Sequence, residues 1–304
     1  MMVDPNYRMG LAQAIGQSSA TEQTLTSQLS SGLRVTQLSD DPVAVAENVG
    51  LSSSISGLDS FVQSATSEQG MMQVSDDALG QVVTQVTSAL SVAVSASNGT
   101  MSSADLKAAQ TQIANIRDGV MALGNTSYQG QYVFSGSQGS TKPFTLDTTT
   151  NPATATYNGD ASTQKIATPN GQMVGVNVPG SSVFMASGSS LLGTLNQLVS
   201  DIGALAAGSG SSASVEADST ALTQALGTVS SQRATLDSSL SQLMTASGYA
   251  STQATTYTAV QSSLLSADPA TVATQLSTAE VQHQALLGVT ATLEGAQDLF
   301  DYLK

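Results

Sequence analysis

The sequence predicts a mainly α-helical protein with a small β-rich insertion, whose two ends form a long antiparallel helical bundle or coiled-coil stalk. Apolar residues recur at alternating steps of three and four along both ends of the chain. This spacing disappears near residue 136, where Gly, Pro, Thr and Asn become frequent, and returns near residue 191. Neither end can bury its apolar stripe alone, so we expect the two ends to pair and the middle to protrude.

The first helical segment carries a weak apolar stripe. The stripe runs from Leu11 through Ile15 to Leu25 and Leu29, but its middle positions are polar. Isolated helices with weak stripes are marginal in water. We therefore expect this segment to need a partner.

Helix starts and stops are well marked. Gly32 can adopt the left-handed conformation that closes a helix. Asp41 is a candidate cap with a proline directly after it, where the missing N–H costs nothing, and Asp268 repeats this arrangement. Ser102 and Asp105 form a predicted capping box.

The apolar spacing predicts six further helical segments. The first is short and ends towards Gly57, where the next begins. Gly227 and Gly248 weaken the longest run without breaking its period. The predicted segments cover residues 42–57, 58–97, 103–123, 191–205, 222–264 and 269–300.

Strand composition appears at 131–134 and again at 155–157 before an Asn-Gly turn. Residues 165–167 and 173–178 flank Pro169-Asn170-Gly171, and Asn-Gly between two extended runs is a strong hairpin signal. We predict three domains. They are a terminal helical domain of residues 1–38 plus 269–304, a helical bundle of 39–135 plus 191–268, and a β-rich outer domain of 136–190.

Composition excludes several kinds of partner. The net charge is −14, from 8 basic and 22 acidic residues, which disfavours binding to nucleic acid or to an anionic membrane surface. Only 10% of residues are charged, 4% are aromatic, and Cys and Trp are absent. No segment approaches the ~18 consecutive apolar residues of a membrane span. The N-terminus does not have a signal-peptide pattern, so general rules alone indicate the cytoplasm.

Leu29-Ser30-Ser31-Gly32-Leu33-Arg34-Val35, followed by Ser39-Asp40-Asp41-Pro42, resembles the N-terminal signature of the flagellin superfamily. Further segments resemble the hook–filament junction branch of that superfamily. They are Asn98–Ser102, Gly130–Gly136 with Lys142-Pro143-Phe144, Tyr157–Asp160, Val178–Phe184 and Leu299–Leu303. The chain departs from the usual pattern at Gln297-Asp298-Leu299, where a Ser-Leu pair is more typical.

The resemblance implies a structural part of the bacterial flagellum, an adaptor between hook-associated subunits and flagellin. The implied partners are other hook-associated proteins, flagellin, further copies of the chain in a ring and an export chaperone. The implied location is extracellular, after export without a cleaved signal. The two terminal segments would then be unstructured before assembly and would supply the subunit interface. The candidate interface residues are Leu11, Ile15, Leu25, Leu29, Arg34, Leu276, Leu286, Leu293, Phe300 and Leu303.

Catalytic chemistry is not indicated. His283 lies on an apolar stripe, and the absence of Cys removes a thiol nucleophile and a zinc ligand. Asp40 with Asp41 could form a metal carboxylate pair, but helix capping explains them better, and Asp76 with Asp77 is expected on a solvated face. We therefore predict no enzyme activity, cofactor or metal.

Two questions stay open at this point. Arg34 either holds the segment between the first two predicted helices in place at a contact between subunits, or is a solvated cation that contributes little to stability. The alternatives to the junction adaptor are a short flagellin, a secreted helical adhesin and an enzyme that depends on His283.

Overall fold

The computed structural model describes residues 5–301 and confirms a mainly helical protein with small strand pairs. The chain divides into two compact units. We call the described residues up to Gly57, together with those from Gln253 onward, the terminal unit, and residues 58–252 the middle unit. The predicted three-domain division stays a prediction. The helices are α1 (Pro5–Ser31), α2 (Pro42–Ser97), α3 (Ser103–Gly124), α4 (Gly180–Phe184), α5 (Leu191–Ala206), α6 (Ser212–Leu265) and α7 (Pro269–Asp301).

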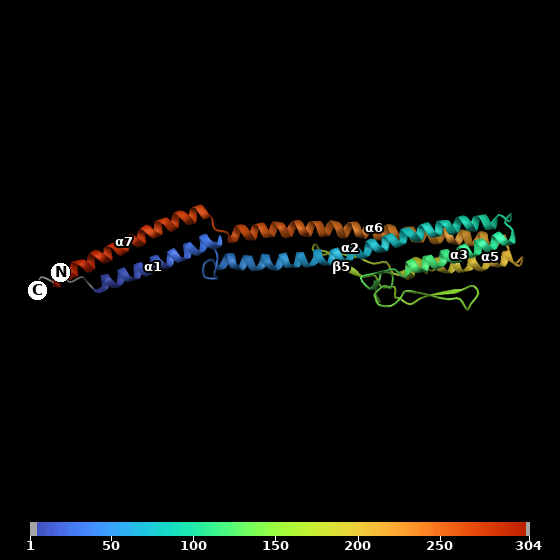
Figure 1. The fold of residues 1–304 in the computed structure, drawn as a ribbon, viewed down its shortest axis with the longest axis horizontal. Helices are drawn as coiled ribbons and strands as arrows, with labels where there is room; N and C mark the ends of the chain where they lie inside the picture. The colour runs from blue at the N-terminus through green and yellow to red at the C-terminus, as the bar shows by residue number, and fades with distance from the viewer. Residues whose placement is uncertain (1–4, 302–304) are drawn as a thin grey trace. The chain divides into compact units, whose positions relative to one another are not determined.

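In the terminal unit, α1 and α7 lie side by side as an antiparallel pair (Figure 1). Their buried cluster is small: Leu25 from α1 with Val272 and Ala279 from α7, against which Ala267 and Leu276 pack. Few apolar atoms leave water here, so this pair has a much thinner core than an ordinary helical domain.

The middle unit has a much larger core, formed where α3 and α5 pack together beside α2 and α6 (Figure 1). Leu79 and Val86 of α2, Ile113 of α3, Leu195 of α5 and Leu222 of α6 are all fully buried. Each lies on a helical stripe, because i, i+3 and i+4 positions share one helix face. Ser102 caps α3: its Oγ accepts from the Asp105 N–H at 3.2 Å, and Asp105 Oδ2 accepts from the Ser102 N–H at 3.3 Å.

One ion pair joins α2 and α6 in the middle unit. Arg233 Nε and Nη2 donate to the two carboxylate oxygens of Asp76 at 2.6 and 2.9 Å. The expectation that Asp76 and Asp77 form a solvated face is therefore wrong for Asp76, although Asp77 is exposed. The hydrogen bonds from Arg233, opposed in part by burial, lower the pKa of Asp76.

The strands form three separate two-stranded antiparallel sheets rather than one continuous sheet. The hairpin around Asn170-Gly171 is present, with Ile166 opposite Val174. Residues 133 and 134 are not in a strand, and residues 154–157 pair with a strand that the sequence did not predict, Phe144–Asp147. The pairs are β1 (Ser127–Tyr128) with β2 (Gln131–Tyr132), β3 (Phe144–Asp147) with β4 (Thr154–Tyr157), and β5 (Lys165–Ala167) with β6 (Met173–Gly175).

Three fully buried phenylalanines anchor the strand-bearing segment to the helices. The rings of Phe134 and Phe144 each lie edge-on to Phe184, with centroids 5.4 and 5.0 Å apart. Gly124 at the end of α3 and Gly180 at the start of α4 allow this approach. A Cβ on either glycine would lie 2.9 or 2.7 Å from the Phe144 ring.

Tyr157 and Asp160 hold the turn that follows β4. The Tyr157 hydroxyl donates towards the Phe134 carbonyl at 2.9 Å and the Asp160 carbonyl at 2.7 Å. Asp160 accepts hydrogen bonds from the hydroxyl and amide of Ser137 and from the Ser162 amide, which lower its pKa to about 2. Gly159 has no space for a Cβ, because Tyr157 Oη would lie 2.5 Å away. These residues therefore define a tight local structure.

Helix α2 is continuous, so the predicted break near Gly57 is wrong. A Cβ at Gly57 would contact nothing within 4 Å, and a single glycine costs a helix only about 1 kcal/mol. By length and composition alone, α2 is apolar enough to cross a membrane, but one such helix is weak evidence because buried core helices pass the same test.

We predict that Gly180→Ala destabilises the middle unit by about 1–3 kcal/mol, because its Cβ would collide with Phe144 and with the Phe134 carbonyl, 2.7 and 2.9 Å away. Gly227→Ala is the control, since nothing lies within 4 Å of its Cβ. That variant is expected to gain about 0.5–1 kcal/mol. Urea unfolding followed by circular dichroism measures both, and equal effects of the two variants would contradict the packing described.

Candidate functional site

The candidate site is the pair of connectors in the terminal unit, residues 32–41 between α1 and α2 and residues 266–268 between α6 and α7. Gly32 ends α1 with a φ of +70°, and its amide donates to the Gln28 carbonyl at 2.9 Å. A side chain at this position would be strained, because L-residues other than Gly rarely adopt a positive φ. The predicted role of Gly32 as a helix stop is confirmed.

The two connectors are hydrogen-bonded to each other. Leu33 and Ser266 form an isolated antiparallel bridge. The Arg34 amide donates to the Leu265 carbonyl at 2.7 Å, and the Ala267 amide donates to the Gly32 carbonyl at 2.9 Å. The two connectors are therefore bridged at one point, although residues 42–265 lie between them in the sequence.

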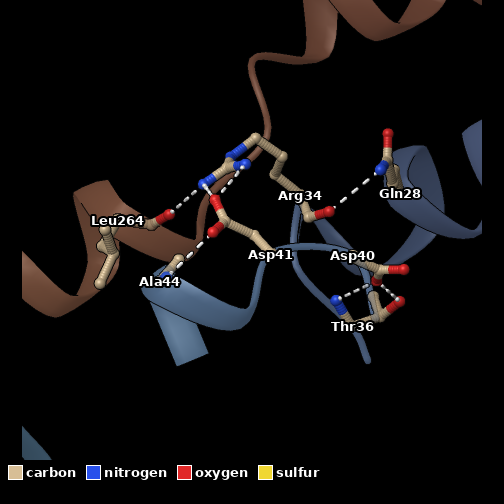
Figure 2. A network of polar contacts seen from close by, with 7 residues as sticks. All are labelled: Gln28, Arg34, Thr36, Asp40, Asp41, Ala44 and Leu264. Carbon is tan, nitrogen blue, oxygen red and sulfur yellow. Dashed lines mark hydrogen bonds and ion pairs between the residues drawn. The ribbon is translucent and has the colours of Figure 1, made fainter. Parts of the chain in front are cut away.

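Arg34 fastens this bridge, as Figure 2 shows. Its Nη1 and Nη2 both donate to Asp41 Oδ2 at 3.1 Å, and Nη2 also donates to the Leu264 carbonyl at 3.2 Å. Its own carbonyl accepts from Gln28 Nε2 at 3.0 Å. A cation at the C-terminal end of α6 also complements the helix dipole. Arg34 thus contacts α1, α2 and α6 within one chain, an arrangement that the two sequence-based interpretations did not include.

The two adjacent aspartates have separate structural roles (Figure 2). Asp41 Oδ1 accepts from the Ala44 amide at 3.0 Å and caps α2. This bond, followed by that from Arg34, lowers the pKa of Asp41. Asp40 Oδ2 accepts from the amides of Thr36 and Gln37 at 3.0 and 2.8 Å, and these bonds lower its pKa. Both carboxylates thus support the connector.

The second connector is fixed by Asp268, which caps α7. Its Oδ1 accepts from the Ala270 amide at 3.2 Å and its Oδ2 from the Thr271 hydroxyl at 2.6 Å. The Thr271 hydroxyl and then the Ala270 amide lower the pKa of Asp268. Nearby, Gln261 of α6 donates to Asn48 Oδ1 of α2 at 2.6 Å, a further polar contact between the two long helices.

The candidate interface residues divide by burial. Leu25 is buried between α1 and α7, whereas Leu29 is 42% exposed and the Arg34 side chain 47% exposed. The side chain of Phe300 and the whole of Leu303 lie outside the described residues. Half-buried positions are Leu11, Ile15, Leu276, Leu286 and Leu293. Their role in contacts between subunits stays a prediction.

Sequence reasoning missed a second set of apolar residues in the terminal unit. These side chains are not on the α1–α7 stripe and remain exposed; Val281, for example, is 64% exposed. Its position two residues after Ala279 places it near the opposite helix face, which the sequence could have indicated. The set, which we call the exposed apolar set, consists of Tyr7, Met9, Leu33, Leu38, Val43, Val49, Val260, Val281, Leu287 and Val289.

His283 lies in the α1–α7 pair. Its Nδ1 is 3.9 Å from Glu22 Oε1, and both side chains are about three-quarters buried. Ser18, one turn before Glu22, has a buried hydroxyl without a hydrogen-bond partner. The described residues 5–301 contain no group of three or more His, Asp or Glu side chains arranged to hold a metal ion.

Replacing Arg34 with Ala is expected to loosen the connector bridge without unfolding the middle unit. In Arg34→Ala, we expect the backbone amides of residue 34 and of Ala267 to exchange with solvent about two- to fivefold faster than in the wild type. This range corresponds to the loss of an exposed ion pair. Arg34→Lys keeps the charge but not the two-pronged donor, so its effect should be smaller. Hydrogen exchange with mass spectrometry measures this, and unchanged exchange in Arg34→Ala would remove the assigned role.

The comparisons with known proteins agree with this architecture. Residues 6–139 match the family model of the bacterial flagellin N-terminal helical region. The flagellar hook-associated protein 3 of Salmonella typhimurium is 34% identical over 146 residues. That alignment covers 48% of this chain and 44% of the relative, so the chain spans less than half the length of this relative.

Two solved structures share the fold. The flagellar hook-associated protein 3 of Legionella pneumophila aligns with a TM-score of 0.62 at 15% identity, over 70% of this chain and 98% of the other. A flagellar junction protein of the same organism aligns with a TM-score of 0.57 at 15% identity, over 74% of this chain and 100% of the other. The N-terminal part of the chain is thus similar to the bacterial flagellin N-terminal helical region, and the chain shares the fold of these two flagellar proteins.

Proposed function

We propose that this chain is a structural subunit of the bacterial flagellum, an adaptor at the hook–filament junction that connects hook-associated subunits to flagellin. The observation that carries the proposal is the distribution of exposed apolar side chains. Eleven of the fifteen large exposed apolar residues in the described part of the chain lie in the terminal unit, which contains only about a third of the residues. Leu29 and the exposed apolar set make up these eleven.

The terminal unit also has the smaller core, with three buried apolar residues in its α1–α7 cluster. A helix pair with little buried area and many exposed apolar side chains gains stability when a further surface covers it. Copies of the same unit, together with the equivalent units of other flagellar proteins, are the partners that we propose.

The names of the relatives support the junction rather than the filament. The Salmonella relative is named hook-associated protein 3, and one neighbour of the same fold is described as a flagellar junction protein. Flagellin A of Helicobacter mustelae also matches, at 31% identity over 139 residues. An experiment must therefore distinguish a flagellin role from the junction role.

The proposal extends to features that rest on the family resemblance. The subunits would form a ring, and an export chaperone would hold the chain before export without a cleaved signal. The role is structural rather than enzymatic, in line with the relatives that the chain matches. The β-rich segment of residues 136–190 would form the outer domain of the subunit.

We predict that a strain lacking this chain makes hooks without filaments and sheds flagellin into the medium. Electron microscopy of the cells and immunoblotting of the medium test this, with the wild-type gene restored as control. Normal filaments would reject the junction role. Loss of the most abundant filament protein would instead identify a flagellin, and loss of surface adhesion with intact flagella would identify an adhesin.

Val281→Asp is expected to block assembly while leaving the monomer folded, because Val281 is 64% exposed in the terminal unit. A buried charge at a subunit contact costs several kcal/mol, enough to abolish incorporation. Val94→Asp is the matched control, since Val94 is 48% exposed in the middle unit. Swimming radius and filament counts should fall to the deletion level for Val281→Asp only, and equal motility of the two variants would contradict the proposal.

A further inference from the structure

Two carboxylates meet at one end of the middle unit, where α5 and α6 are joined by a short turn. Asp218 of α6 is 8% exposed and interacts directly with Asp201 of α5. Asp201 Oδ1 accepts a hydrogen bond from Gln197 Nε2 at 3.0 Å. Asp218 Oδ2 is buried and has no hydrogen-bond partner. A buried carboxylate oxygen without a donor is costly, because burial removes the water that would solvate its charge.

No cation among the described residues offsets these two charges. On α6, the neighbouring Glu216 is acidic and exposed, and α2 carries no charged residue from Ala78 to Ser97. On α3, Lys107 is exposed, and Arg117 pairs with Asp118 at 2.8 Å. Asp201 is therefore the charged group that acts on Asp218, and it opposes ionisation.

A shared proton resolves this arrangement. When one carboxyl of a close pair is protonated, its O–H donates to the other carboxylate, and the pair titrates as a unit. Burial, followed by the charge of Asp201, raises the pKa of Asp218 from 3.8 to about 7. The proton is thus retained in the folded chain at pH values where an unfolded aspartate has lost it.

We propose that Asp201 and Asp218 form a proton-binding site that fastens the α5–α6 end of the middle unit and releases it when the proton is lost. In the protonated state, one hydrogen bond joins the two helices. In the deprotonated state, two negative charges repel each other across the same contact.

The direction of the pH effect follows from the two titrations. Between about pH 4 and pH 7 the folded chain binds a proton that the unfolded chain does not, so stability falls as pH rises through this window. Above pH 7 both states have lost the proton, and the folded state retains the full repulsion. The helix ends around the pair should then open more often than the rest of the unit.

The test is hydrogen exchange of the full chain at pH 5 and pH 8, corrected for the intrinsic pH dependence of exchange. Peptides covering the end of α5 and the start of α6 should lose about tenfold or more of their protection at pH 8, since each pKa unit of difference corresponds to a tenfold change in equilibrium. Peptides from the Phe134–Phe144–Phe184 cluster should change less. Equal protection of the α5–α6 end at both pH values would overturn the proposal.

Asp218→Asn and Asp201→Asn each replace one carboxylate by an amide that can donate to the other. Both variants should keep the α5–α6 end protected at pH 8 and lose the pH dependence. Glu216→Gln removes a nearby exposed charge from the same helix and should keep the wild-type pH dependence. If both aspartate variants retain that dependence, or if Glu216→Gln abolishes it, the pair is not the proton-binding site.

Discussion

The packing of α1 against α7 depends on a handful of buried side chains, Leu25, Val272 and Ala279 among them. The middle unit, in contrast, holds three fully buried phenylalanines and most of the buried leucines and valines. With 4% aromatic residues in the chain, large apolar side chains are scarce, and their uneven distribution gives the two units different properties. The middle unit has an extensive core of its own, while the terminal unit leaves many of its large apolar side chains exposed.

Two arginines connect elements that are distant in sequence. Arg233 joins α6 to α2 through Asp76, and Arg34 joins the first connector to the end of α6 through Asp41 and the Leu264 carbonyl. Each guanidinium group donates from two nitrogens, which fixes the orientation of the contact. A lysine, with a single ammonium group, would fix the orientation less well. Such partly exposed pairs add little stability, but they define which residues face each other along otherwise uniform helices.

Local signals in the sequence predicted the long helices, the stop at Gly32 and the hairpin at Asn170-Gly171, because short-range chemistry determines these features. They did not predict the short α4 or the first ten residues of α6, residues 212–221. The continuity of α2 through Gly57 was not predicted, since the cost of one glycine is small beside the length of the helix. The pairing of Asp76 with Arg233, 157 residues away, and of β3 with β4 depends on the tertiary fold. At the candidate site, the caps were readable from the sequence, whereas the contact of Arg34 with α6 was not.

The bridge between the connectors has a mechanical consequence. Two backbone hydrogen bonds, Arg34 to Leu265 and Ala267 to Gly32, attach the C-terminal end of α1 to the N-terminal end of α7. A force applied to α1 or to α7 is therefore shared by both connectors through these two bonds. Helices α1 and α7 therefore bear tension jointly.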